Sequence, residues 1–68
     1  ARVNEMWYEL MGSHMSNYTE KIILRGNTLF VSLNNAALRE ELGYGKEKIM
    51  KMMNEQLGKE IIEKVVLR

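Results

Sequence analysis

The segment that most constrains the fold of this chain covers residues 19–42, where two short apolar runs lead directly into a helix start. The runs at residues 19–25 and 28–33 are apolar at their centres, with Ile22-Ile23-Leu24 in the first and Leu29-Phe30-Val31 in the second, and Gly26-Asn27 separates them. Glycine first in a two-residue loop favours a type II′ turn, whose twist matches that of paired strands. The sequence therefore predicts an antiparallel β-hairpin.

Period two assigns the hairpin side chains to two faces. One face is apolar and carries Ile22, Leu24, Leu29, Val31 and Leu33. The other face is mixed and carries Lys21, Ile23, Arg25, Thr28, Phe30 and Ser32. On this mixed face, Lys21, Arg25 and Phe30 fit a surface that stacks and neutralises single-stranded nucleic acid. The alternative is an ordinary solvated sheet face, with Ile23 and Phe30 partly covered by the N-terminal helix or by a second copy of the chain.

The hairpin is preceded by a predicted helix at residues 2–11, whose apolar stripe is Val3, Met6, Trp7 and Leu10. Trp7 is expected to be a core anchor, and Gly12 is suited to end the helix. Residues 13–18 are polar, show no strong pattern and predict a connector.

Two more helices and a strand are predicted after the hairpin. Asn34 or Asn35 is expected to cap a helix that ends at Gly43, a glycine terminator of the kind that has a positive φ. The next helix covers residues 46–57, and its predicted buried stripe is Ile49, Met50, Met53 and Leu57. Residues 60–67 are rich in β-branched side chains and predict a last strand, which must return beside one of the first two strands.

The resulting order is α-β-β-α-α-β, which predicts an α+β fold with a three-stranded sheet and helices packed on one face. Residues 1–68 are expected to form a single domain, the core of a slightly longer protein.

Composition limits the classes of function. The chain has no cysteine, no aspartate and one histidine, so the side chains that build thiolate zinc sites, calcium loops and acid–base pairs are scarce. We therefore expect no enzyme, no cofactor, no metal and no small-molecule substrate. No apolar run approaches the roughly 20 residues of a membrane span, and no signal peptide is evident, so a cytoplasmic protein is expected. The net charge of +1 does not by itself predict nucleic-acid binding.

The chain resembles the DciA-type family of bacterial proteins, which are associated with loading or operating the replicative helicase. The matching features span nearly the whole chain: Trp7, Gly12, Thr19, Leu29, Val31, Asn34-Asn35, Glu41-Leu42, Asn54-Glu55-Gln56-Leu57-Gly58 and Val65-Val66-Leu67-Arg68. The family more often has serines where this chain has Asn34-Asn35, and both residue types cap helices. The spacing from Trp7 through Gly12 to Thr19 is the same in the family. This agreement favours Gly12-Ser13-His14-Met15 as a native segment, although these four residues also match the remnant of a purification tag.

The resemblance implies a KH-like domain of the second type that contacts DNA and the replicative helicase without catalysis. Members of the family often carry further segments outside this core. KH domains clamp a nucleic-acid backbone with a Gly-x-x-Gly loop, and Gly43-Tyr44-Gly45-Lys46 occupies the corresponding place. That loop is one residue short of the motif, so the alternative is a plain connector between two helices.

The best candidates to meet phosphates are Arg25 at the hairpin tip and Lys46, Lys48 and Lys51 in the predicted third helix. A few backbone contacts of this kind predict weak, sequence-independent DNA binding. The other interpretation is a protein-interaction or self-associating domain without nucleic-acid binding, with an open sheet edge as the site of pairing. The Met50, Met52 and Met53 cluster would then serve either as core filling or as an adaptable binding surface.

Overall fold

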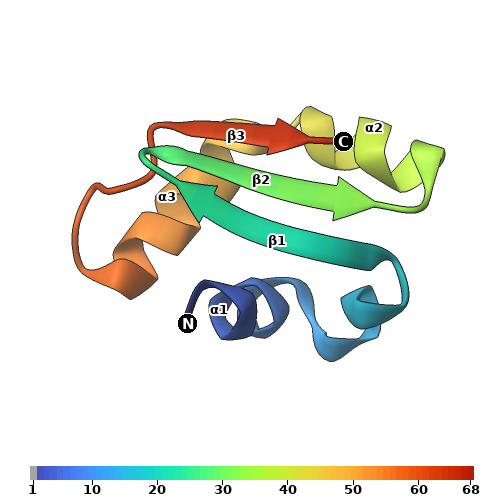
Figure 1. Ribbon diagram of the computed structural model, residues 1–68, viewed down its shortest axis with the longest axis horizontal. Helices are drawn as coiled ribbons and strands as arrows, with labels where there is room; N and C mark the ends of the chain where they lie inside the picture. Colours follow the sequence, from blue (N-terminus) through green and yellow to red (C-terminus); the bar gives the residue numbers. More distant parts are fainter. Residues whose placement is uncertain (1) are drawn as a thin grey trace.

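The fold is built on a three-stranded sheet with helices along one side of it (Figure 1). The computed structural model describes residues 2–68. The elements in chain order are helix α1 (Arg2–Met11), 3-10 helix η1 (Ser13–Asn17), strands β1 (Thr19–Arg25) and β2 (Thr28–Leu33), helices α2 (Ala36–Gly43) and α3 (Lys46–Leu57), and strand β3 (Lys64–Leu67). This confirms the predicted α+β class and the order α-β-β-α-α-β.

The hairpin forms at the predicted residues. β1 pairs antiparallel with β2, and Ile22 lies opposite Val31 while Leu24 lies opposite Leu29. Gly26 has a φ of 61°, whereas Asn27 does not have a positive φ. A type II′ turn requires this combination, since a type I′ turn needs positive φ at both central residues. The turn therefore fixes the register that puts Ile22, Leu24, Leu29 and Val31 on the face that packs against the core.

β3 lies beside β2 and runs parallel to it, so the second strand of the hairpin is the middle of the sheet. The prediction of a strand over residues 60–67 is wrong for its first four residues, because β3 begins only at Lys64. The reason is that its partner strand, β2, begins only at Thr28. The ladder starts at the pair Thr28–Lys64, and the Asn27 carbonyl accepts the N–H groups of Glu63 and Lys64 at 2.8 and 3.2 Å. Before that point β2 offers no backbone for pairing.

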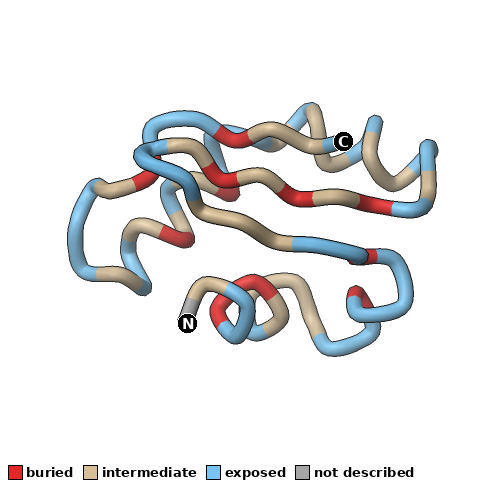
Figure 2. Tube along the Cα trace, in the orientation of Figure 1, coloured by how far each residue is buried: buried red, intermediate tan, exposed pale blue. Residues whose placement is uncertain are grey.

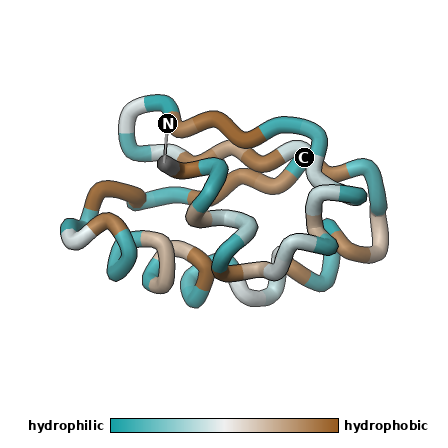
Figure 3. The backbone as a smooth tube through the Cα atoms, turned by 90° about the horizontal axis from the view of Figure 1, so that it is seen from below, coloured by the Kyte–Doolittle hydropathy of each residue, from teal (hydrophilic) through white to brown (hydrophobic). Residues whose placement is uncertain are grey.

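The core lies between the sheet and the helices. Its side chains come from every layer of the fold: Met6, Trp7, Met15, Leu29, Val31, Leu33, Ile49, Met53, Ile62 and Val65. Buried positions recur at every second residue of β2, as expected for the middle strand of a sheet with one covered face (Figure 2). Seen at right angles, the strands form one layer and the helices α2 and α3 lie beneath it (Figure 3).

The N-terminal part of the chain contributes more to the core than its sequence predicts. Trp7 is fully buried, as predicted, and its Nε1–H donates to the Thr19 hydroxyl at 3.2 Å. Gly12 ends α1 with a φ of 99°, also as predicted. The predicted connector after it contains the 3-10 helix η1, which turns the chain so that Met15 is buried in the core.

The caps of α2 differ in part from the prediction. Asn35 is the N-cap, and its side-chain oxygen accepts the Leu38 N–H at 2.9 Å, while the Asn34 amide bonds to the Asn17 carbonyl. Helix α2 ends at Gly43, but this glycine is not among those with positive φ. Gly43 therefore does not act as a left-handed terminator. The next residue, Tyr44, also lies in the right-handed region. It is the C-cap of α2, and its N–H donates to the Glu41 carbonyl.

Candidate nucleic-acid interface

The face of the sheet that points away from the helices is a regular array of side chains. In Figure 1 the helix α3 passes behind the strands, so this face is turned to the viewer. The pairing of the strands places its residues in three rows. The rows are Arg25, Thr28 and Lys64; then Ile23, Phe30 and Val66; then Lys21, Ser32 and Arg68, the last being one residue beyond β3. We call these nine residues the open face.

The open face is basic at its corners and apolar along its middle row. The four corner side chains, Lys21, Arg25, Lys64 and Arg68, are exposed. The middle row is half-buried and does not belong to the side chains that pack against the core. No glutamate occupies any of the nine positions, although the chain has nine acidic residues in all. The small hydroxyl residues Thr28 and Ser32 lie between the corner cations in the two outer rows.

Phe30 lies at the centre of the open face, with Arg68 stacked on it. The Arg68 guanidinium carbon is 4.7 Å from the centre of the Phe30 ring. An arginine at this distance is attracted by the negative face of the ring. The flat side of the ring is therefore able to receive a planar cationic or aromatic group.

The local sequence explains why these side chains are turned outward. Leu29 and Val31 are fully buried on the opposite face of β2, so Phe30 between them points to the solvent side. In the same way Val65 packs into the core and leaves Lys64 and Val66 on the open face. Glu20 has no partner in the ladder, because the register shifts between Thr19 and Lys21, and this bulge allows Thr19 to be buried although Lys21, two residues further on, is exposed.

The structure divides the predicted phosphate-binding residues between two surfaces. Arg25 lies on the open face beside the hairpin turn, as the prediction placed it. Lys46, Lys48 and Lys51 are all exposed on α3, which packs into the core through Ile49 and Met53 on the other side of the sheet. The shared face of Lys21, Arg25 and Phe30 is confirmed by the strand register. The four predicted cations do not form one cluster.

The open face also contains residues that the sequence did not reveal, namely Lys64, Val66 and Arg68. The period-two spacing of these residues could have placed them on one face of the last strand. Nothing in the sequence showed which of the first two strands β3 joins, or in which direction. The parallel pairing with β2 decides both and brings them beside Phe30.

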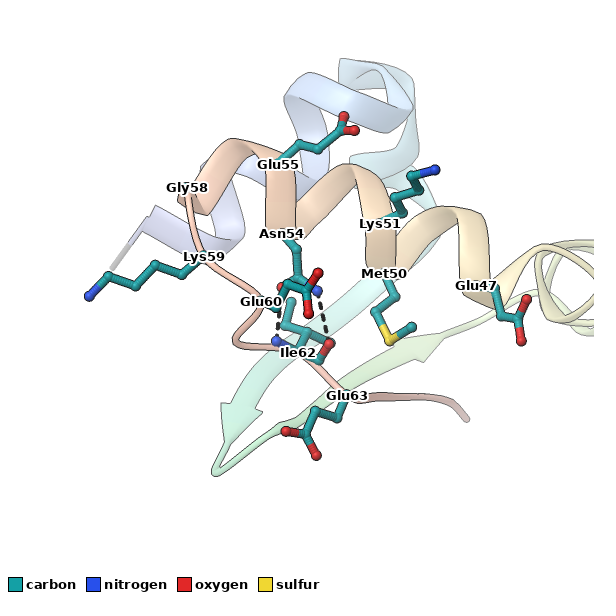
Figure 4. A pocket seen from close by; sticks show the side chains of 10 residues that line it. All are labelled: Glu47, Met50, Lys51, Asn54, Glu55, Gly58, Lys59, Glu60, Ile62 and Glu63. Carbon is teal, nitrogen blue, oxygen red and sulfur yellow. Dashed lines mark hydrogen bonds between the residues drawn. The ribbon is translucent and has the colours of Figure 1, made fainter.

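A groove of about 850 Å³ runs between α3 and the segment that leads to β3 (Figure 4). Its charged lining consists of two lysines, Lys51 and Lys59, and four glutamates, Glu47, Glu55, Glu60 and Glu63. Asn54 forms its inner wall and fixes the returning chain, since its side-chain oxygen accepts the N–H groups of Ile61 and Ile62 and its amide donates to the Ile62 carbonyl. The excess of carboxylates opposes binding of a phosphate in this groove.

The loop between α2 and α3 is a tight connector. The N–H groups of Tyr44 and Gly45 both donate to carbonyls of α2, those of Glu41 and Leu42. They are therefore not free to hold a phosphate as the N–H groups of a Gly-x-x-Gly loop do. The Tyr44 ring is 83% exposed, and its hydroxyl lies 3.4 Å from a carboxylate oxygen of Glu40.

Within residues 2–68, no group of three or more histidine, cysteine, aspartate or glutamate side chains is arranged to hold a metal ion. None of the helices in this same part of the chain is both long and apolar enough to cross a membrane.

The fold and the open face define a class of protein, a small α+β module with one basic, partly apolar sheet surface. The comparison with protein families is more specific. The family model described as "Dna[CI] antecedent, DciA" matches residues 1–67, and the chain therefore belongs to the DciA family. No match was found among curated proteins or among solved structures.

Membership in this family connects the chain with the loading of the replicative helicase during DNA replication. It also implies an interaction with that helicase, and the family is not known as a catalytic one.

Proposed function

We propose that this domain is a non-enzymatic accessory module of bacterial DNA replication, which binds the replicative helicase and makes weak contacts with DNA. The observation that carries the proposal is the match of the DciA family model to residues 1–67. The basic side chains on the surface support the DNA contact. Such a module acts where the chromosome is copied, in the bacterial cytoplasm.

The proposed phosphate contacts are the predicted residues Arg25, Lys46, Lys48 and Lys51, all of them exposed. A cation on the surface attracts a phosphate whatever the base sequence, and binding releases the counterions condensed on the DNA. The contacts are few, and Glu47 lies among the lysines of α3. We therefore expect weak binding without sequence preference, of micromolar affinity or poorer.

The test combines two measurements on the purified protein. Fluorescence anisotropy with a labelled single-stranded oligonucleotide is recorded at low and at moderate salt, and a pull-down is performed with the cognate replicative helicase. Lys46→Glu combined with Lys48→Glu should reduce DNA affinity without changing the circular dichroism spectrum, because both side chains are solvated. No DNA binding at low salt together with no retention of the helicase would exclude the replication role for this domain.

A second candidate function, self-association through a sheet edge, is favoured by one observation. β1 is an edge strand of seven residues, and one row of its backbone N–H and C=O groups has no partner strand. An edge of this length is a template for pairing with another chain, although the bulge at Glu20 and the exposed Lys21 and Arg25 work against it. Sedimentation equilibrium over a wide concentration range distinguishes a monomer from a self-associating chain, because only the self-associating chain has an apparent mass that rises with concentration.

A further inference from the structure

We propose that the open face is a binding surface for single-stranded DNA, on which one base stacks on Phe30 and the corner cations meet the phosphates. The inference rests on the proposed DNA contact and deepens it. It names the surface, the state of the DNA and the residue that recognises it.

The dimensions of the open face suit an extended strand. Successive rows are two residues apart along the strands, roughly 7 Å, and neighbouring strands are roughly 5 Å apart. The corner residues Lys21 and Arg25 are therefore separated by roughly 13 Å along β1, with Lys64 and Arg68 at a similar separation along β3. Phe30 lies between these two pairs. A DNA backbone that follows either edge of the open face can thus place a base over the Phe30 ring.

The charge of the open face favours a polyanion. Four cations surround the middle row, and none of the nine side chains is acidic. Protein–protein interfaces also have an apolar centre and a polar rim, so the feature that favours a polyanion is that all the charged side chains of this face are positive. Here the apolar part is a single row of three side chains, Ile23, Phe30 and Val66.

The central aromatic ring explains why the DNA should be single-stranded. A base that stacks on a side chain must be turned out of its own stack, and single strands offer such bases freely. Duplex DNA presents phosphates but keeps its bases inside. In the free protein the Arg68 guanidinium covers the Phe30 ring. An incoming base takes its place, and the released guanidinium meets a phosphate.

The lysines of α3 do not surround an aromatic ring on which a base could stack. Lys46, Lys48 and Lys51 lie on the other side of the sheet, and the exposed aromatic residue nearest to them in sequence is Tyr44. Tyr44 therefore provides a matched control. It is an exposed aromatic side chain in the same molecule, and it is not part of the open face.

The experiment measures anisotropy with three labelled ligands of equal length: oligothymidylate, an abasic single strand and a duplex. The abasic strand keeps the phosphates and removes the stacking partner. For the wild-type protein, oligothymidylate should bind more tightly than the abasic strand. Phe30→Leu should weaken oligothymidylate binding roughly tenfold, as expected for one lost base–aromatic stack, and should leave the abasic affinity unchanged. Phe30→Tyr should retain the affinity, and Tyr44→Leu should have no effect.

Spectroscopic mapping gives a second readout that does not depend on a variant. In the wild-type protein, oligothymidylate should shift the amide resonances of Ile23, Phe30 and Val66 and leave those of Ile49 and Met53 unchanged. Equal affinity for oligothymidylate and the abasic strand, with Phe30→Leu unaltered, would overturn the stacking surface and leave a purely electrostatic contact. If the wild-type protein binds none of the three ligands at low salt, the proposed DNA contact itself is wrong.

Discussion

At the scale of single residues, the contact between Trp7 and Thr19 ties the first helix to the first strand. The indole is fully buried, and its N–H has a hydrogen-bond acceptor in the buried Thr19 hydroxyl. A buried tryptophan combines a large apolar surface with one polar group that needs a partner. Both requirements are met here, so this pair fixes the position of α1.

Trp7→Ala should lower the free energy of unfolding by about 3–5 kcal/mol, because the cavity left behind cannot collapse fully. A core of this size rarely supplies more than about 5 kcal/mol in total, so the variant should be largely unfolded at room temperature. Urea denaturation followed by circular dichroism measures the change. Trp7→Phe keeps most of the volume and should remain folded, and a stably folded Trp7→Ala protein would show that α1 contributes little to the core.

Replacing a glycine by alanine should raise or lower the stability of the protein according to the backbone conformation of that glycine. Gly43 is helical without a positive φ, and a Cβ there meets no atom within 4 Å, so Gly43→Ala should stabilise the protein by up to about 1 kcal/mol. Gly58 has equal space but a φ of 77°, so Gly58→Ala should destabilise by about 1 kcal/mol. Thermal unfolding of the two variants tests the pair. A loss of stability in Gly43→Ala would contradict the helical conformation of that residue.

Residue patterns predicted most of these roles, and the exceptions have a physical reason. Trp7 and Gly12 could be assigned from helical spacing, since both act locally. Met15 could not, because a single methionine in a polar stretch shows no period, and only the tertiary position of η1 buries it. The φ of Gly43 was equally inaccessible, because glycine can end a helix in more than one conformation.

At the scale of elements, Asn54 joins α3 to the chain that returns to the sheet. Its side chain makes three hydrogen bonds to the backbone of Ile61 and Ile62, and Ile62 is then buried in the core. These bonds replace the strand pairing that residues 60–63 lack. The sequence predicted a strand here from β-branched residues alone, a preference that depends on having a partner strand.

Asn54→Ala should destabilise the protein by about 2–3 kcal/mol, because it leaves partly buried backbone groups without partners. Amide hydrogen exchange provides the specific readout. The Ile61 and Ile62 amides should exchange much faster in the variant, whereas the Val31 amide in the middle strand should change only in proportion to global stability. Gln56→Ala, an exposed position of the same helix, is the control. Unchanged protection of Ile61 and Ile62 would show that Asn54 is not their main constraint.

At the scale of the whole molecule, strand order converts scattered charges into one surface. The net charge is only +1, yet four of the cations share the open face without an acidic side chain. Composition could not reveal this arrangement, because it depends on the parallel pairing of β3 with β2. The sequence predicted the hairpin half of the face, including Arg25, and the topology supplied the other half.

This arrangement predicts the salt dependence of DNA binding. Four phosphate contacts on a single strand give a slope of about −3 for the logarithm of the affinity against the logarithm of the salt concentration. Arg25→Gln combined with Lys64→Gln should reduce the slope by about half. Lys48→Gln combined with Lys51→Gln removes the same charge from α3 and should reduce the slope less than the open-face variant does if the open face is the main site. Equal reductions in both variants would mean that the two surfaces bind DNA together.

The burial of Trp7 has a practical consequence for optical experiments. It is the single tryptophan of the chain, and it lies in the core on the helix side of the sheet. Its intrinsic emission should therefore follow unfolding closely and remain constant when a ligand occupies the open face. A change in tryptophan emission on adding DNA would report a rearrangement of α1 relative to β1, which makes the native fluorophore a built-in sensor of conformational change.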